Sequence, residues 1–186
     1  MYFRFMSYFQ QKLNTQLNSA FDLLSQLRDM TGLIYLHDQN SPIIAFLPQK
    51  FLLFQQSILK QFHQTEFNQY TQADTSSIID FSSFDSKQTS QSDTCFNGGY
   101  IGFFSYDYSA NQFVDAAHHP QPNFFLGQYT SFLKFHKNEW YFYSDSQDQY
   151  IYEQISILLN KPMNEKLNPL FLLEKCHPRW SKQQYI

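Results

Sequence analysis

Short apolar runs rich in aromatic residues, each followed by a polar turn, set the narrowest limits on how this chain can fold. Aromatic and β-branched residues favour strands, and apolar runs of roughly four to eight residues bounded by turn residues are typical of strands. Such runs cover residues 33–36, 43–47, 51–54, 100–106, 124–129, 131–136 and 140–143. Lys137, Asn138 and Glu139 separate the last two runs and predict a hairpin turn.

The aromatic content is large enough to fill a core between such strands. The chain has 186 residues with 21 Phe and 13 Tyr, which suits one globular domain. Many strands with few helices predict an α+β fold. We expect mainly antiparallel sheets packed face to face, in a β-sandwich-like arrangement with a few flanking helices.

Two or three helices are expected from the spacing of apolar residues. The residues that recur at steps of three and four toward the amino terminus are Leu13, Leu17, Phe21, Leu24 and Leu27. This spacing predicts an amphipathic helix that ends before Gly32. Residues 150–159 show the same periodicity, and residues 58–62 suggest a short helical stretch.

A polar segment over residues 65–94 is rich in Ser, Thr, Asp and Gln. We expect a long loop around one short strand there. A flexible low-complexity insert fits the same composition, so both interpretations stay open.

Composition excludes several classes of partner. The net charge is −3 and no basic patch stands out, which argues against nucleic acid. No apolar run is long enough for a membrane span, and the first residues do not fit a signal peptide, so we expect a cytoplasmic protein. Cys95 and Cys176 lie far apart without CxxC spacing, as free thiols do.

No catalytic motif stands out from the residues alone. The glycines of residues 98–102 precede a strand rather than a helix, so they do not fit a dinucleotide fingerprint. His118 and His119 fit a solvated loop better than a metal site, because adjacent side chains on a strand point to opposite faces. His37 beside Asp38 fits an ordinary polar turn, although a pH-tuned pair is the alternative.

The last residues have the spacing of a helix start. Ser181 with Gln184 three positions later is a capping-box pattern, and one turn cannot sustain itself. We expect the helix to continue in a longer parent protein, which makes this chain truncated; a frayed natural terminus is the alternative.

Four segments, in order, resemble one known domain. They cover residues 32–48, residues 96–107, residues 122–129 and residues 180–185. Together they resemble the amino-terminal domain shared by the large components of anthranilate synthase and aminodeoxychorismate synthase. The second segment, FNGGYIGFFSYD, is the most specific, and the motif residues in it are Gly98, Gly99, Gly102, Tyr106 and Asp107.

The resemblance implies a parent enzyme with two domains, of which only the carboxy-terminal one is catalytic. Residues 1–176 would be the amino-terminal domain, and residues 177–186 would be a linker and the first helical turn of a carboxy-terminal chorismate-binding domain. The parent enzyme would aminate chorismate with ammonia from a glutamine amidotransferase small subunit (component II). Its Mg²⁺ and catalytic residues would lie in the carboxy-terminal domain. This chain would then hold no catalytic residue, no metal and no cofactor of its own.

The resemblance also implies a tryptophan-binding pocket in the amino-terminal domain. The matching positions are Leu36, His37, Asp38, Ser41 and Ile43. A carboxylate or hydroxyl would receive the ligand's ammonium group, and apolar strand residues would hold the indole. The alternative is that these are turn and core residues without a ligand.

Several functional alternatives stay open. The chain lacks the LES…GRYS pattern usual in anthranilate synthases, which favours the aminodeoxychorismate enzyme and para-aminobenzoate and folate biosynthesis. An anthranilate synthase domain for tryptophan biosynthesis, or a stand-alone module that binds tryptophan or a partner without catalysis, are the alternatives. A β-rich carbohydrate or lipid binder is a third. The family interpretation expects the double-glycine segment (residues 98–106) to form a strand in the middle of a sheet. That strand would lie beside the early strand pair, which is formed by residues 33–36 and 43–47.

Overall fold

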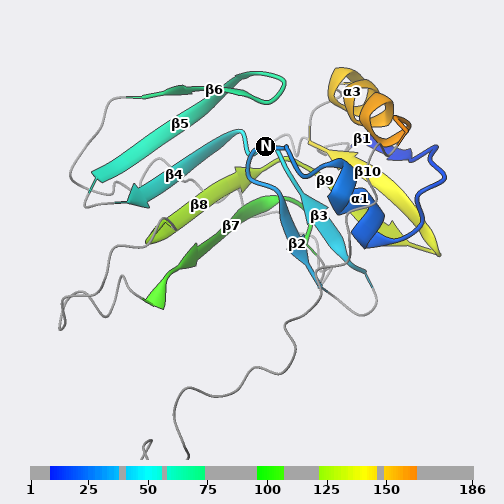
Figure 1. The fold of residues 1–186 in the computed structure, drawn as a ribbon, viewed down its shortest axis with the longest axis horizontal. Coiled ribbons are helices and arrows are strands. Elements are labelled where there is room, and N and C mark those ends of the chain that lie inside the picture. Colours follow the sequence, from blue (N-terminus) through cyan, green and yellow to red (C-terminus); the bar gives the residue numbers. More distant parts are fainter. Residues whose placement is uncertain are drawn as a thin grey trace, which may run out of the picture.

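The structure, a computed structural model, describes residues 9–37, 41–55, 58–73, 96–106, 122–145 and 149–162. These residues form two five-stranded antiparallel sheets and two helices, and Figure 1 shows the helices over one sheet only. The chain therefore has the predicted α+β fold with two antiparallel sheets packed together. The predictions for Cys95, His118, His119, Cys176 and residues 177–186 lie outside the described residues.

Sheet A combines strands from the two ends of the described chain. Its order is β1 (Phe9–Lys12), β10 (Glu139–Ser144), β9 (Ser131–His136), β3 (Ile43–Ala45) and β2 (Ile34–Leu36). The β9–β10 hairpin turns at Lys137 and Asn138, which both have positive φ, at 51° and 65°. Two successive left-handed residues suit the twist of a tight hairpin, so the predicted turn is confirmed.

Sheet B contains the double-glycine strand. Its order is β6 (Gln69–Gln72), β5 (Ile58–Glu66), β4 (Lys50–Gln55), β8 (Phe124–Tyr129) and β7 (Gly99–Phe104). One face buries Leu52, Leu59 and Phe124 in a small apolar cluster. The opposite face turns toward sheet A, because Ile101 and Phe125 on that face join a cluster with residues of sheet A.

Two pairs of strands continue from one sheet into the other. β3 leads into β4 and β8 into β9, and the two resulting long strands pair with each other in both sheets. At the corner between the sheets, the Gln49 N–H donates to the Gln128 carbonyl at 2.8 Å. Buried Leu47 takes φ 51° there, just before Pro48. The two sheets are therefore halves of one bent, paired structure.

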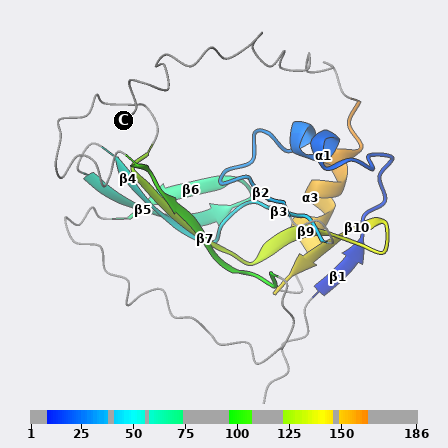
Figure 2. The ribbon, with the colours of Figure 1, turned by 90° about the horizontal axis from the view of Figure 1, so that it is seen from below.

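The two helices cover one face of sheet A, as Figure 2 shows. α1 (Ala20–Gln26) and α3 (Gln149–Leu159) contact each other, and the Gln26 side-chain amide donates to the Lys161 carbonyl at 2.7 Å. The core beneath them contains Leu23, Leu27, Ile44, Leu133, Trp140, Phe142, Ile155 and Leu159. Since the described helices are short, none of them could span a membrane.

The amino-terminal helix begins later than its periodicity predicted. Leu13 follows β1, and its N–H donates to the Trp140 carbonyl at 2.9 Å, so pairing with β10 takes the backbone that a helix would need. Ser19 begins the helix, and its Oγ accepts from the Asp22 N–H at 3.0 Å. Leu13 and Leu17 still pack in the same core, which explains why their spacing resembled a helix face.

The expectation of a helical stretch at residues 58–62 was wrong. These residues lie in β5, where Phe62 stacks on Phe51 of β4 with ring centroids 4.6 Å apart. The predicted loop over residues 65–94 also begins too early, because β6 pairs with β5 through a turn at Asn68. Cross-strand aromatic packing overrides local helical spacing at this place.

Candidate functional site

The candidate site is the junction where the double-glycine strand meets the early strand pair. An inter-sheet cluster fills it, with a buried centre of Ile43, Ala45, Tyr129 and Phe132. Ile34, Leu36, Phe96, Ile101, Phe125 and Tyr143 pack around that centre. Ile101 of β7 thus shares a cluster with Leu36 of β2 and Ile43 of β3.

The double-glycine strand is at an edge of sheet B, not in mid-sheet as expected. Among the described strands, β7 pairs only with β8, and the early strand pair belongs to the other sheet (Figure 1). The two regions meet because their sheets pack together at the corner, so contact runs through side chains rather than backbone pairing. Sequence order does not reveal which strands become neighbours, and this explains the error.

Leu36 and Ile43 are the predicted pocket residues that reach the cluster. They are direct register partners in the β2–β3 pair, and Ile43 is 3% exposed. The register continues across the same face of sheet A from Leu36 through Ile43, Lys134, Tyr141 and Lys12. The apolar end of this row packs against sheet B, and its other end is polar.

Ser41 lies beside this row but its hydroxyl is already bonded to protein. Its Oγ donates to the Phe135 carbonyl at 3.1 Å, and the side chain is buried. The Phe135 N–H donates in return to the Pro42 carbonyl at 3.0 Å. Both bonds attach the segment before β3 to β9. The oxygen of a donating hydroxyl still has acceptor capacity, so it can receive an N–H from a ligand.

His37 and Asp38 are not brought to the cluster by the described structure. His37 is exposed, and its Nδ1 lies 3.1 Å from the Tyr35 hydroxyl. Tyr35 and Leu36 are adjacent on a strand, so they point to opposite faces of sheet A. Asp38 lies outside the described residues.

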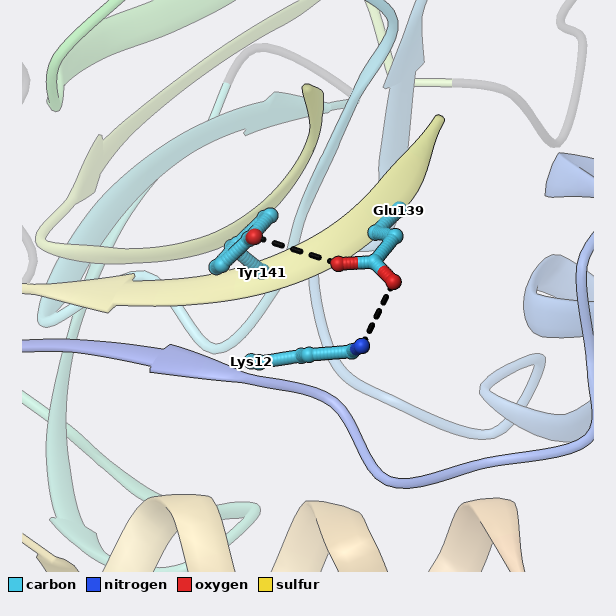
Figure 3. Close-up of polar contacts among 3 residues, drawn as sticks. All are labelled: Lys12, Glu139 and Tyr141. Carbon is cyan, nitrogen blue, oxygen red and sulfur yellow. Dashed lines mark hydrogen bonds and ion pairs between the residues drawn. The ribbon is translucent and has the colours of Figure 1, made fainter. Parts of the chain in front are cut away.

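At the polar end of this row, Lys12 and Tyr141 both bond to the Glu139 carboxylate, as Figure 3 shows. Lys12 Nζ lies 2.5 Å from Glu139 Oε1, and the Tyr141 hydroxyl donates to Glu139 Oε2 at 3.2 Å. The hydrogen bond with Lys12 lowers the pKa of Glu139 and raises the pKa of Lys12. The lowered pKa makes this carboxylate a weaker proton acceptor, and both of its oxygens already accept hydrogen bonds.

A second cation lies nearer to the apolar cluster. Lys134 Nζ is 5.9 Å from the centroid of the Tyr143 ring, within the range of a cation–π contact. Tyr143 stacks in turn on Phe132, with centroids 5.3 Å apart and planes 3° apart. Burial raises the pKa of Tyr143.

The double-glycine motif has a structural explanation. Gly98 and Gly99 have φ of 90° and 125°, conformations that side chains rarely adopt. At Gly102 an added Cβ would collide with the Phe125 carbonyl of β8, so glycine permits the close approach of the strands. Tyr106 is 85% exposed after β7, and Asp107 lies outside the described residues.

Sequence reasoning missed a stripe of aromatic side chains on sheet B. This aromatic stripe consists of Tyr70, Phe62, Phe51, Phe125 and Phe103, from four neighbouring strands and β6 at its edge. Its ring centroids are 4.6 to 6.1 Å apart, and Phe103 is 38% exposed. Each strand shows a Phe or Tyr in the sequence, but only the register of the strands reveals that the rings align.

Buried Tyr129 and partly buried Tyr70 lie beside the corner. The Tyr129 hydroxyl donates to the Gly32 carbonyl at 2.6 Å. Burial raises the pKa of Tyr129 and of Tyr70 far above the usual value, and the nearby Tyr70 adds to the shift at Tyr129.

The chemistry available at the junction is apolar contact with a few hydrogen bonds. Within the described ranges, no group of three or more His, Cys, Asp or Glu side chains could hold a metal ion. Leu36, Ile43 and Ile101 supply aliphatic side chains to the cluster, and Ser41, two residues before Ile43, supplies a hydroxyl. These groups suit packing or ligand binding.

Comparison with protein-family models and with curated protein sequences finds no match to this chain.

Proposed function

We propose that this chain is the amino-terminal, non-catalytic domain of a chorismate-aminating synthase, of the aminodeoxychorismate type. The observation that carries the proposal is that Ile101, in the double-glycine strand, belongs to the same inter-sheet cluster as Leu36 and Ile43 of the early strand pair. These residues come from the two most informative segments of the resemblance, 60 or so positions apart in the sequence. The two packed antiparallel sheets support the same proposal.

The proposal assigns the reaction to a separate carboxy-terminal domain. That domain would hold Mg²⁺ and chorismate, and a glutamine amidotransferase small subunit would supply ammonia to form 4-amino-4-deoxychorismate. The pathway would be cytoplasmic and would lead to para-aminobenzoate and folate.

Reconstitution from two pieces tests the proposal. This chain would be purified and mixed with a chorismate-binding domain of an aminodeoxychorismate synthase, with chorismate, Mg²⁺ and an ammonium salt. We expect no turnover by this chain alone and formation of 4-amino-4-deoxychorismate by the matched pair, identified by mass. Amination by this chain alone would overturn the proposal.

A second candidate function is binding of tryptophan at the same junction. The observation that favours it is the buried Ser41 hydroxyl, which lies two residues before Ile43 of the apolar cluster that also contains Leu36. A hydroxyl oxygen can accept from the ammonium group of the ligand, and the aliphatic residues can hold its indole.

Titration calorimetry with tryptophan tests this second function. We expect heat of binding for the unmodified chain and about tenfold weaker binding for Ser41→Ala, which corresponds to roughly one hydrogen bond of about 1.4 kcal/mol. Ser25→Ala is the matched control, because Ser25 bonds only within its own helix, to the Phe21 carbonyl. Absence of heat at millimolar tryptophan would contradict binding without affecting the family proposal.

A further inference from the structure

We draw no further inference here: the strongest candidate, the aromatic stripe on the face of sheet B that turns toward sheet A, is a partly exposed apolar surface, and nothing in the described part of the structure shows what covers it.

Discussion

Tyr129 connects more parts of this molecule than any other single side chain described above. It ends β8 at the corner between the sheets, contributes its ring to the inter-sheet cluster and donates to the Gly32 carbonyl in the loop after α1. An added Cβ at Gly32 would contact both Pro48 and the Tyr129 hydroxyl, so this loop packs closely against the corner. The position therefore couples the helical layer to both sheets.

Removal of the Tyr129 hydroxyl should destabilise the fold. Tyr129→Phe leaves the Gly32 carbonyl without its donor, and a buried polar group without a partner costs about 1 to 3 kcal/mol. Urea unfolding followed by circular dichroism measures the loss. Tyr35→Phe is the control, since the Tyr35 hydroxyl bonds to His37 at the surface and should cost under about 0.5 kcal/mol. Equal effects of the two substitutions would contradict this assignment.

Stability should fall at alkaline pH because of the buried tyrosines. Burial raises the folded-state pKa of Tyr129 and Tyr70 above the unfolded value of about 10. Below that value both states are protonated and these groups cause no pH dependence. Above it the unfolded state releases protons that the folded state retains, so the free energy of unfolding decreases as pH rises.

A Tyr70→Phe variant tests whether Tyr70 contributes to this loss of stability at alkaline pH. Urea midpoints measured from pH about 8 to about 11.5 should decline less steeply above pH about 10 in Tyr70→Phe than in the unmodified chain. Tyr150→Phe is the control, because Tyr150 is half exposed on α3. Parallel pH profiles for Tyr70→Phe and the unmodified chain would exclude Tyr70 as a source.

At the scale of elements, hydrogen bonds from the tip of the β5–β6 hairpin connect sheet B to the loop after α1. Asn68 takes φ 55°, its Oδ1 accepts from the Thr31 N–H at 2.8 Å, and its Nδ2 donates to the Asp29 carbonyl at 3.1 Å. One side chain therefore supplies both the turn and two contacts between elements that are distant in the sequence.

Substitution of Asn68 should separate these two contributions. Asn68→Gly keeps the left-handed backbone but removes both hydrogen bonds, at a cost of about 1 to 2 kcal/mol, and Asn68→Ala should cost about 1 kcal/mol more through backbone strain. Thermal or urea unfolding measures both. Asn138→Gly in the exposed β9–β10 turn, where φ is 65°, is the matched control and should be nearly neutral. A neutral Asn68→Gly would show that the hydrogen bonds contribute little.

The edge strand β1 should depend on the contacts of Glu139. Phe9 packs on Phe142, and the Lys12–Glu139 pair fixes the other end of the strand. Glu139→Gln should speed amide hydrogen exchange in residues 9–12, while global stability changes little because both charged side chains of the pair are about half exposed to solvent. Glu66→Gln, at the exposed end of β5, is the control. Unchanged exchange in β1 would contradict the role of the pair.

Acid should weaken the same attachment. The folded-state pKa of Glu139 is lowered, so the pair stabilises the fold above the unfolded Glu value of about 4.3 and is lost as pH falls through the folded value. In the unmodified chain, exchange in β1 should therefore increase relative to β10 when pH drops below about 4.

The elements that the sequence predicted best were those with strong local signals. Residues 124–129 and 131–136 form β8 and β9 as expected, because aromatic runs and turn residues mark both ends. β5 and β6 were missed because Gln, Thr and His dominate them, and their pairing depends on the stack of Phe62 on Phe51. Leu13 was misassigned because its backbone partner, Trp140, is remote in the sequence.

At the scale of the whole molecule, the sequence predicted the fold class but not the arrangement that forms the candidate site. Alternation and turns indicate antiparallel sheets, and they do not specify that β7 ends at an edge or that β2 and β3 join the other sheet. The cluster that Ile101 shares with Leu36 depends on that arrangement. Ser41 was predicted as a ligand group, and its bond to the Phe135 carbonyl could not be foreseen without the register of β3 and β9.

The shared strands predict that the two sheets unfold together. β3–β4 and β8–β9 each run through both sheets, so loss of either sheet removes partners from the other. Amide resonances of sheet A and sheet B should disappear at the same urea concentration, as in a two-state transition. Disappearance of sheet B at a lower concentration, with sheet A intact, would contradict this prediction.

The bent strand pair also restricts how this chain can change in length. Because side chains alternate along a strand, deleting one residue between Ala45 and Lys50 would turn β4 over, moving Phe51 and Leu53 to the side now occupied by Leu52. The partner strand, β8, would keep its original orientation, so the register that places Lys50 opposite Gln128 would be lost. Insertions and deletions at this corner would therefore have to arise in compensating pairs.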